Sequence, residues 1–136
     1  MSQENVQLVR RFIDAFNRRD RETFAALLHP EVEWHSFVTP LLGLAETIRG
    51  RDELLRVTFE RIPKVLDDWH SVSLEIKELP GGQVLSVARY EAQGSSSGAE
   101  TTMGSTAIYR FDSGMIVHVR EFRTRAEALE AVGLSE

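Results

Sequence analysis

The sequence predicts one α+β domain in which helices come first and an antiparallel sheet follows. Two patterns predict this architecture. In the first half of the chain, apolar residues recur at three- and four-residue steps, which is the period of an amphipathic helix. From Trp69 onward, alternating stretches are separated by glycine-containing turns, as in a β-meander. We therefore expect helices on one face of a curved sheet, with an apolar pocket enclosed between them.

Length, charge and composition restrict the domain count and the partners. The 136 residues, 42% of them hydrophobic, suffice for one core, so residues 1–136 are expected to form a single domain. A net charge of −5 without a basic stripe argues against nucleic-acid binding. The sequence contains no cysteine, no apolar run of membrane-spanning length and no recognisable secretory signal. We expect a cytoplasmic protein that does not associate with membranes and whose partner is a small molecule or a protein.

Two helices are predicted at the N-terminus. Ser2 is a suitable N-cap for the first, and Asp20 for the second, which stops at His29–Pro30. The apolar face of the first helix consists of Val6, Val9, Phe12, Ile13 and Phe16. Both helices carry an apolar stripe, and we expect them to pack against each other as a hairpin.

A strand and a third helix are predicted next. Residues 31–38 alternate, which places Trp34 on one side of a strand and Glu33 and His35 on the other, without indicating which side faces the core. The following amphipathic pattern predicts a helix, and Pro63 is expected to kink or shorten its last turn.

Four strands and a terminal helix complete the predicted fold. The strands span residues 70–79, 83–93, 100–111 and 114–122. Thr124 and Glu127 form a capping box that opens the terminal helix, and Gly133 closes it. In a meander one antiparallel strand separates the second strand from the fourth, so these two run in the same direction.

The last strand carries the most informative carboxylate. Val117 and Val119 precede Glu121 on one face, which places Glu121 at the rim of an apolar space. The second strand of the meander shows the same order, with two apolar residues followed by Arg89 and Glu91. Counting through both turns places Glu91 level with Glu121, with the guanidinium of Arg89 beside both carboxylates.

Two interpretations of this pattern remain open. Two carboxylates in different environments around one arginine suit general acid/base catalysis, in which one takes a proton and the other donates one. The alternative is a cross-strand ion pair on a solvent-exposed face. Such pairs are common and contribute little to the stability of the fold. His35 is a candidate polar contact or second base. Because His29, His70 and His118 show no ligand-like spacing with His35, we predict no metal site.

Four segments, residues 8–20, 27–35, 48–52 and 114–122, carry a family resemblance. With these segments the chain resembles the SnoaL-like branch of the nuclear transport factor 2-like superfamily over nearly its full length. The resemblance implies a cone-shaped α+β barrel with a deep pocket, often as a homodimer packed through the sheet. Members of this superfamily include polyketide cyclases, ketosteroid isomerases and limonene epoxide hydrolases.

The resemblance also implies roles for individual residues. Limonene epoxide hydrolases use an Arg-x-Asp on one strand and an Asp on the last strand; Arg89-Tyr90-Glu91 and Arg120-Glu121-Phe122 look like these motifs, with glutamate in both aspartate positions. His35 is similar in position to the general-base aspartate of ketosteroid isomerases. Glu121 matches the position of the acidic residue on the last strand of polyketide cyclases.

Three functional hypotheses result. In the first, a cofactor-free enzyme acts on an apolar, oxygenated small molecule, with Glu121 as principal acid/base, Glu91 as its partner and Arg89 as the orienting cation. The expected substrate-binding residues are Phe16, Glu33, Trp34, His35 and Val119. In the second, the protein binds a hydrophobic ligand in the same pocket without catalysis. In the third, His118, Arg120 and Phe122 on the outer face of the last strand form a homodimer surface.

Overall fold

The computed structural model describes the backbone of residues 2–135 and the side chains of residues 3–135, so the predicted cap by the Ser2 side chain lies outside the described part. The helices are α1 (Ser2–Asn17), α2 (Arg21–Ala26), α3 (Arg51–Arg56) and α4 (Arg125–Ala131). The strands are β1 (Leu28–His35), β2 (Thr47–Arg49), β3 (Leu66–Glu78), β4 (Val84–Gly94), β5 (Glu100–Asp112) and β6 (Met115–Phe122). Within residues 2–135, no helix has the length and apolar character needed to cross a bilayer.

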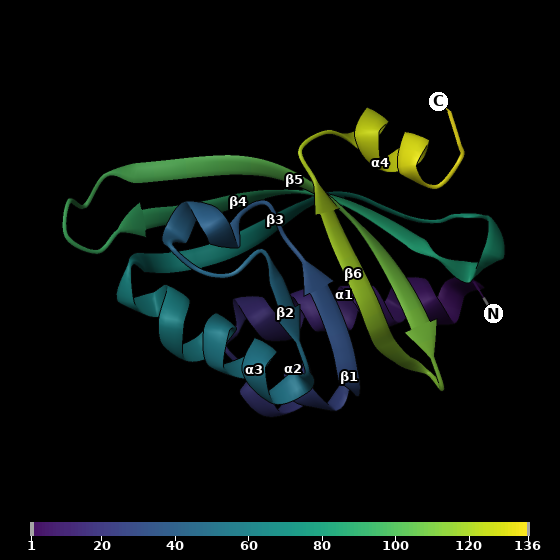
Figure 1. Ribbon diagram of the computed structural model, residues 1–136, viewed down its shortest axis with the longest axis horizontal. Coiled ribbons are helices and arrows are strands. Elements are labelled where there is room, and N and C mark those ends of the chain that lie inside the picture. The colour runs from purple at the N-terminus through teal and green to yellow at the C-terminus, as the bar shows by residue number, and fades with distance from the viewer. Residues whose placement is uncertain (1, 136) are drawn as a thin grey trace.

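The six strands form one curved sheet in the order β2-β1-β6-β5-β4-β3 (Figure 1). Strands β3 to β6 pair as the predicted antiparallel meander. The sheet is extended by β1, which pairs parallel to β6, and by β2, which is antiparallel to β1. The predicted α+β architecture is confirmed. The sheet stays unclosed, because β2 and β3 are its two edges.

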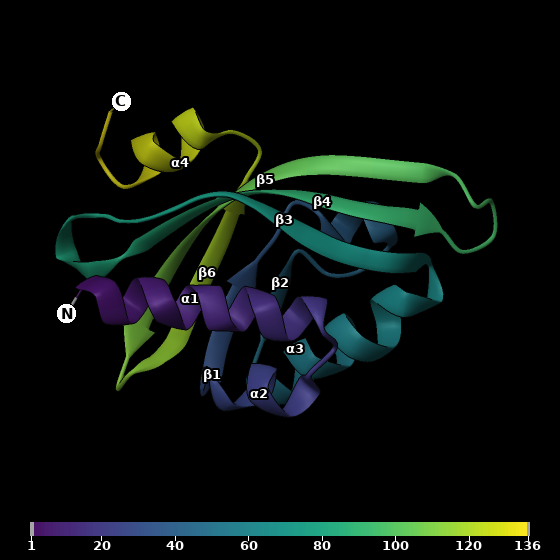
Figure 2. The same cartoon turned by 180° about the vertical axis from the view of Figure 1, so that it is seen from behind.

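The helices lie on both faces of the sheet. Helices α1, α2 and α3 cover the inner face, and α4 lies alone on the outer face (Figures 1 and 2). The main core lies between the inner face and the first three helices, and its α1 residues include Val9 and Phe12, as the helical stripe predicts. A smaller core joins α4 to the outer face through Leu85, Ile108 and Leu129.

Two helix starts follow the predicted local signals, but the predicted stop of the second helix at His29–Pro30 is wrong. Helix α2 already ends at Ala26, and β1 begins at Leu28 and includes both residues, three residues before the predicted strand start. The side chain of Asp20 accepts a hydrogen bond from the backbone N–H of Thr23, and Thr124 accepts one from Glu127, so both predicted N-caps are confirmed. After α3 the helix continues as a π-helical turn (Val57–Arg61) and a 3₁₀ turn (Ile62–Lys64). Pro63 lacks the N–H that a continuing α-helix needs, which agrees with this loss of regular geometry.

Helix α4 is also held by an ion pair to β3, and this contact predicts a pH dependence. The Arg125 guanidinium donates to both carboxylate oxygens of Glu75, at 2.8 and 3.2 Å. These hydrogen bonds lower the pKa of Glu75 below its ordinary value of 4.5. The pair therefore contributes fully to the free energy of unfolding above pH 4.5. This contribution is lost as the pH falls through the lowered pKa that Glu75 has in the folded protein.

We expect Glu75→Gln to reduce the free energy of unfolding by about 1 kcal/mol or less at pH 7, because solvent reaches about a third of the pair. The reduction should shrink toward zero as the carboxylate becomes protonated in strong acid. Urea unfolding of both proteins across the acid range measures this difference. Glu78→Gln, at an exposed position of the same strand, is the matched control. An equal loss in both variants at pH 7 would contradict the role of the pair.

Candidate functional site

Small side chains on the inner face of the sheet leave a cavity beneath the helices. Ser86 and Ala88 of β4 and Ser105 and Ala107 of β5 line a space of about 70 Å³. The space is several times what one water molecule requires. A small ligand or the apolar end of a larger one therefore fits between the sheet and α1.

Glu121 is the only acidic residue among the described residues that line this cavity. Its side chain is buried, and three donors from three other strands hold its carboxylate. Trp34 Nε1 of β1 donates to Oε1 at 3.0 Å. The hydroxyls of Tyr90 on β4 and Ser105 on β5 donate to Oε2 at 2.7 and 2.9 Å. A carboxylate has about four lone-pair positions, so one position, on Oε1, remains for a ligand.

Two tyrosines beside Glu121 remain protonated. Burial and the Glu121 carboxylate raise the pKa of Tyr90 well above its ordinary value of 10, so its hydroxyl is a donor at all physiological pH values. The same two causes raise the pKa of Tyr109. The Tyr109 hydroxyl makes no hydrogen bond to any residue within 3–135, and Tyr109 lines the cavity. It is therefore available as a donor to a ligand.

Aromatic rings form the other walls. Phe12 lies 5.9 Å from Trp34, and Phe16 packs edge-on against Trp69 at 4.8 Å, both between ring centroids. Both tryptophans of the chain thus border the cavity. Asn17 fixes this wall, because its side-chain amide makes two hydrogen bonds, of 2.9 and 2.8 Å, with the backbone carbonyl and N–H of Ser71 on β3.

The structure separates the predicted substrate-binding residues. Phe16 and Trp34 line the cavity together with Glu121. Val119 is fully buried in the core beside the cavity and is absent from its lining. Glu33 and His35 project from the opposite face of β1, so the prediction that they share a site with Trp34 is wrong. Alternation along the strand is the reason, since neighbouring residues point to opposite faces.

The predicted convergence of Arg89 and Glu91 with Glu121 is also wrong. The Glu91 carboxylate accepts hydrogen bonds from Arg89 Nε at 2.8 Å and from His70 Nε2 at 3.0 Å, on the face of β4 opposite to the cavity. These partners lower the pKa of Glu91. The structure thus agrees with the second interpretation of the pattern, an ion pair in contact with solvent.

A β-bulge explains the error. The register of β6 against β5 shifts by one residue at Val117, which brings Ala107 opposite Glu121. Ala107 in turn pairs with Ser86 of β4. A regular ladder would place Glu121 on the face that carries Glu91. The predicted level of Glu91 along the sheet was also wrong. Glu121 is level with Ser86 of β4, and Glu91 lies five residues, roughly 17 Å, farther along that strand.

Sequence reasoning missed Tyr90 and Ser105 as partners of Glu121. Tyr90 lies between Arg89 and Glu91, and the prediction for β4 rested on these two charged residues, which project from the other face of the strand. The available signal was the alternation of Ser86, Ala88 and Tyr90, because small residues on a buried face leave space and a buried tyrosine hydroxyl requires a partner.

Comparisons with known proteins agree with this fold. A family model described as a SnoaL-like domain matches residues 9–119. A search of curated proteins finds no match. An NTF2-like protein of unknown function from Burkholderia pseudomallei K96243 is 25% identical, with a TM-score of 0.79 over 98% of this chain and 99% of that chain.

Two further solved structures show the same fold at lower identity. An LEH-like epoxide hydrolase of M. tuberculosis is 16% identical, with a TM-score of 0.73 over 90% of this chain and 80% of that chain. A protein of Catenulispora acidiphila DSM 44928 with a ketosteroid isomerase-like fold, solved in complex with trimethylamine, is 13% identical, with a TM-score of 0.73 over 93% and 92%.

Proposed function

The chain belongs to the SnoaL-like domain family, and from its cavity we propose that it binds an apolar, oxygenated small molecule and transfers a proton through Glu121. One observation carries this proposal: a single carboxylate, held by three donors, lines an otherwise largely apolar cavity. Relatives that include an epoxide hydrolase and a ketosteroid isomerase-like fold are consistent with small-molecule chemistry.

The free positions around Glu121 favour one type of reaction. The open lone pair of Oε1 accepts a proton from a ligand carbon or hydroxyl, while the unpaired hydroxyl of Tyr109 donates to an oxygen on which negative charge develops. Trp34 and Tyr90 hold the carboxylate in place. A base and an oxyanion donor in one apolar cavity suit isomerisation or cyclisation through an enolate.

Epoxide hydrolysis has less support. The resemblance to limonene epoxide hydrolases implies a site with two carboxylates and an arginine. In this chain Arg89 and Glu91 lie on the face of β4 opposite to Glu121, so they cannot form such a site with it. No arginine or lysine is among the described residues that line the cavity. The opening of an epoxide would have to use a tyrosine hydroxyl as the acid.

Binding without catalysis is the second candidate function. The hydrogen bonds of Glu121 favour this function, because protein donors already fill three of the four lone-pair positions of its carboxylate. Such a carboxylate is well suited to anchor one ligand hydroxyl. Catalysis predicts turnover of the bound compound, whereas binding alone predicts its recovery unchanged.

Ligand binding is tested through the two tryptophans. Trp34 and Trp69 are the only tryptophans in the sequence, and both line the cavity. A ligand should therefore change their fluorescence. We would titrate the protein with pairs of small alicyclic compounds that differ only in one hydroxyl or carbonyl group. The oxygenated member should bind at least tenfold more tightly, because only it reaches Glu121 or Tyr109. Equal affinity within each pair, or no saturable signal with any compound, would contradict the proposal.

Self-association of the protein is a separate proposal. The family resemblance implies a homodimer packed through the sheet, and His118 and Arg120 lie on its outer face. Light scattering after size-exclusion chromatography should give twice the 15.4 kDa mass of the chain. A mass of one chain at micromolar concentration would contradict a stable dimer.

A further inference from the structure

We infer that Glu33, His35 and His118 form a binding site for a divalent transition-metal ion, such as Zn²⁺, on the outer face of the sheet. One donor atom from each of the three side chains lies within 4.8 Å of the other two. The site is separate from the cavity, because Glu33 and His35 project from the face of β1 opposite to Trp34.

The prediction of no metal site considered only spacing along the chain. Strand β6 runs parallel beside β1, and this pairing places His118 directly opposite Glu33. Residues two apart on a strand share a face, so His35 joins them on the same side of the sheet. The three ligands therefore come from two neighbouring strands of a rigid sheet.

The donor set and its distances fit zinc. Two imidazole nitrogens and one carboxylate oxygen occur in zinc sites that keep a fourth position open. Bonds of about 2.0–2.1 Å in a tetrahedral site imply ligand atoms roughly 3.3 Å apart. His35 Nε2 and Glu33 Oε1 already lie 3.3 Å apart. The rings of His35 and His118 are 4.9 Å apart between centroids, and the donor atoms lie within 4.8 Å of one another, so side-chain rotation has to bring His118 closer to complete the site.

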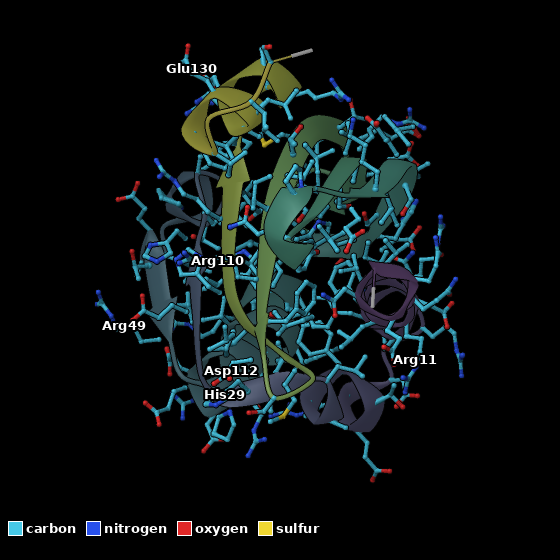
Figure 3. The ribbon with its side chains drawn as sticks, turned by 90° about the vertical axis from the view of Figure 1, so that its right-hand side faces the viewer. Arg11, His29, Arg49, Arg110, Asp112 and Glu130 are labelled. Carbon is cyan, nitrogen blue, oxygen red and sulfur yellow. The ribbon has the colours of Figure 1, made fainter. Side chains whose placement is uncertain are left out.

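Neighbouring residues support the ligands. Thr47 Oγ1 lies 3.2 Å from His35 Nδ1, and its oxygen can accept a hydrogen bond from Nδ1–H when Nε2 binds the metal. Arg49 Nε contacts the other carboxylate oxygen of Glu33 at 3.5 Å, which leaves Oε1 for the ion. Figure 3 shows Arg49 and Arg110 on the side of the sheet away from Arg11 of α1.

The electrostatic surroundings determine which metals bind. Arg110 of β5 pairs directly with His118 of β6, and Arg49 contacts Glu33, so two guanidinium groups lie beside the proposed ligands. The arginines oppose a dication, so metals that bond imidazole strongly should bind, whereas Mg²⁺ should not. His35 and His118 border a groove of about 460 Å³, which leaves room beside them for a fourth ligand.

Calorimetric titration of the full, metal-free and tag-free chain with ZnCl₂ tests the site. Wild-type protein should bind one Zn²⁺ per chain, and His35→Gln and His118→Gln should each weaken binding at least tenfold. His29→Gln is the matched control, because His29 lies beside Asp112 at the other end of β1 (Figure 3). It should bind Zn²⁺ like the wild type. Unchanged binding in His118→Gln, or no saturable binding by wild-type protein, would overturn the inference.

Cobalt provides a test that does not depend on the variants. Co²⁺ in a four-coordinate site absorbs visible light far more strongly than hydrated Co²⁺. Addition of Co²⁺ to the wild-type protein should produce this strong absorption, and Zn²⁺ should remove it. A spectrum that stays that of hydrated Co²⁺ would exclude the proposed geometry, even if the glutamine variants failed to fold.

Discussion

Glu121→Gln is expected to reduce turnover by a factor of 10² to 10⁴ while the protein still folds. The amide cannot accept a proton as the carboxylate does, and general acid/base catalysis accounts for effects of this size. Its oxygen can still accept from Trp34 Nε1, and its NH₂ group can donate to the hydroxyls of Tyr90 and Ser105. We therefore expect the free energy of unfolding to fall by only about 1–2 kcal/mol.

The measurement combines product analysis with urea unfolding of the same preparations. Glu91→Gln is the control, because it removes an equivalent charge from the face of β4 opposite to the cavity. It should keep wild-type turnover. Full activity in Glu121→Gln would reject a role in proton transfer and favour a binding function, whereas equal losses in both variants would contradict the placement of the site.

Ala107→Leu is expected to block the cavity, with a loss of ligand affinity of about 100-fold, or roughly 2.7 kcal/mol. Ala107 is buried, lines the cavity and pairs with both Glu121 and Ser86. Three added carbon atoms point into the space that a ligand needs. Because they enter an existing cavity, the change in the free energy of unfolding should stay below about 1.5 kcal/mol.

Tryptophan fluorescence titration and thermal unfolding measure these two effects. Ala126→Leu adds the same three carbons at an exposed position of α4 and should leave affinity unchanged. If Ala107→Leu binds ligands as tightly as the wild type, the ligand site lies elsewhere. A severe loss of stability would instead show that Ala107 is close-packed and that the cavity does not extend to it.

Local patterns in the sequence were sufficient for the fold class and most elements. The stripe that includes Val9 and Phe12 predicted α1, the caps at Asp20 and Thr124 predicted two helix starts, and the meander followed from alternation and glycine-containing turns. These features depend on interactions within a few residues, which a sequence displays directly. Glu121 was identified in the same way, as the carboxylate that follows apolar residues on the last strand.

Long-range register decided the partners of Glu121, and only the tertiary structure contains that information. The bulge at Val117 changes which face of β4 meets Glu121, so Tyr90 replaces Glu91 beside it. One residue of shift reverses every side chain of a strand, and no local pattern in β6 announces it. The parallel pairing of β1 with β6 likewise brings together His35 and His118, which are far apart in sequence. The sequence by itself determined the elements and the central carboxylate, whereas the pairing of distant strands decided which residues surround it.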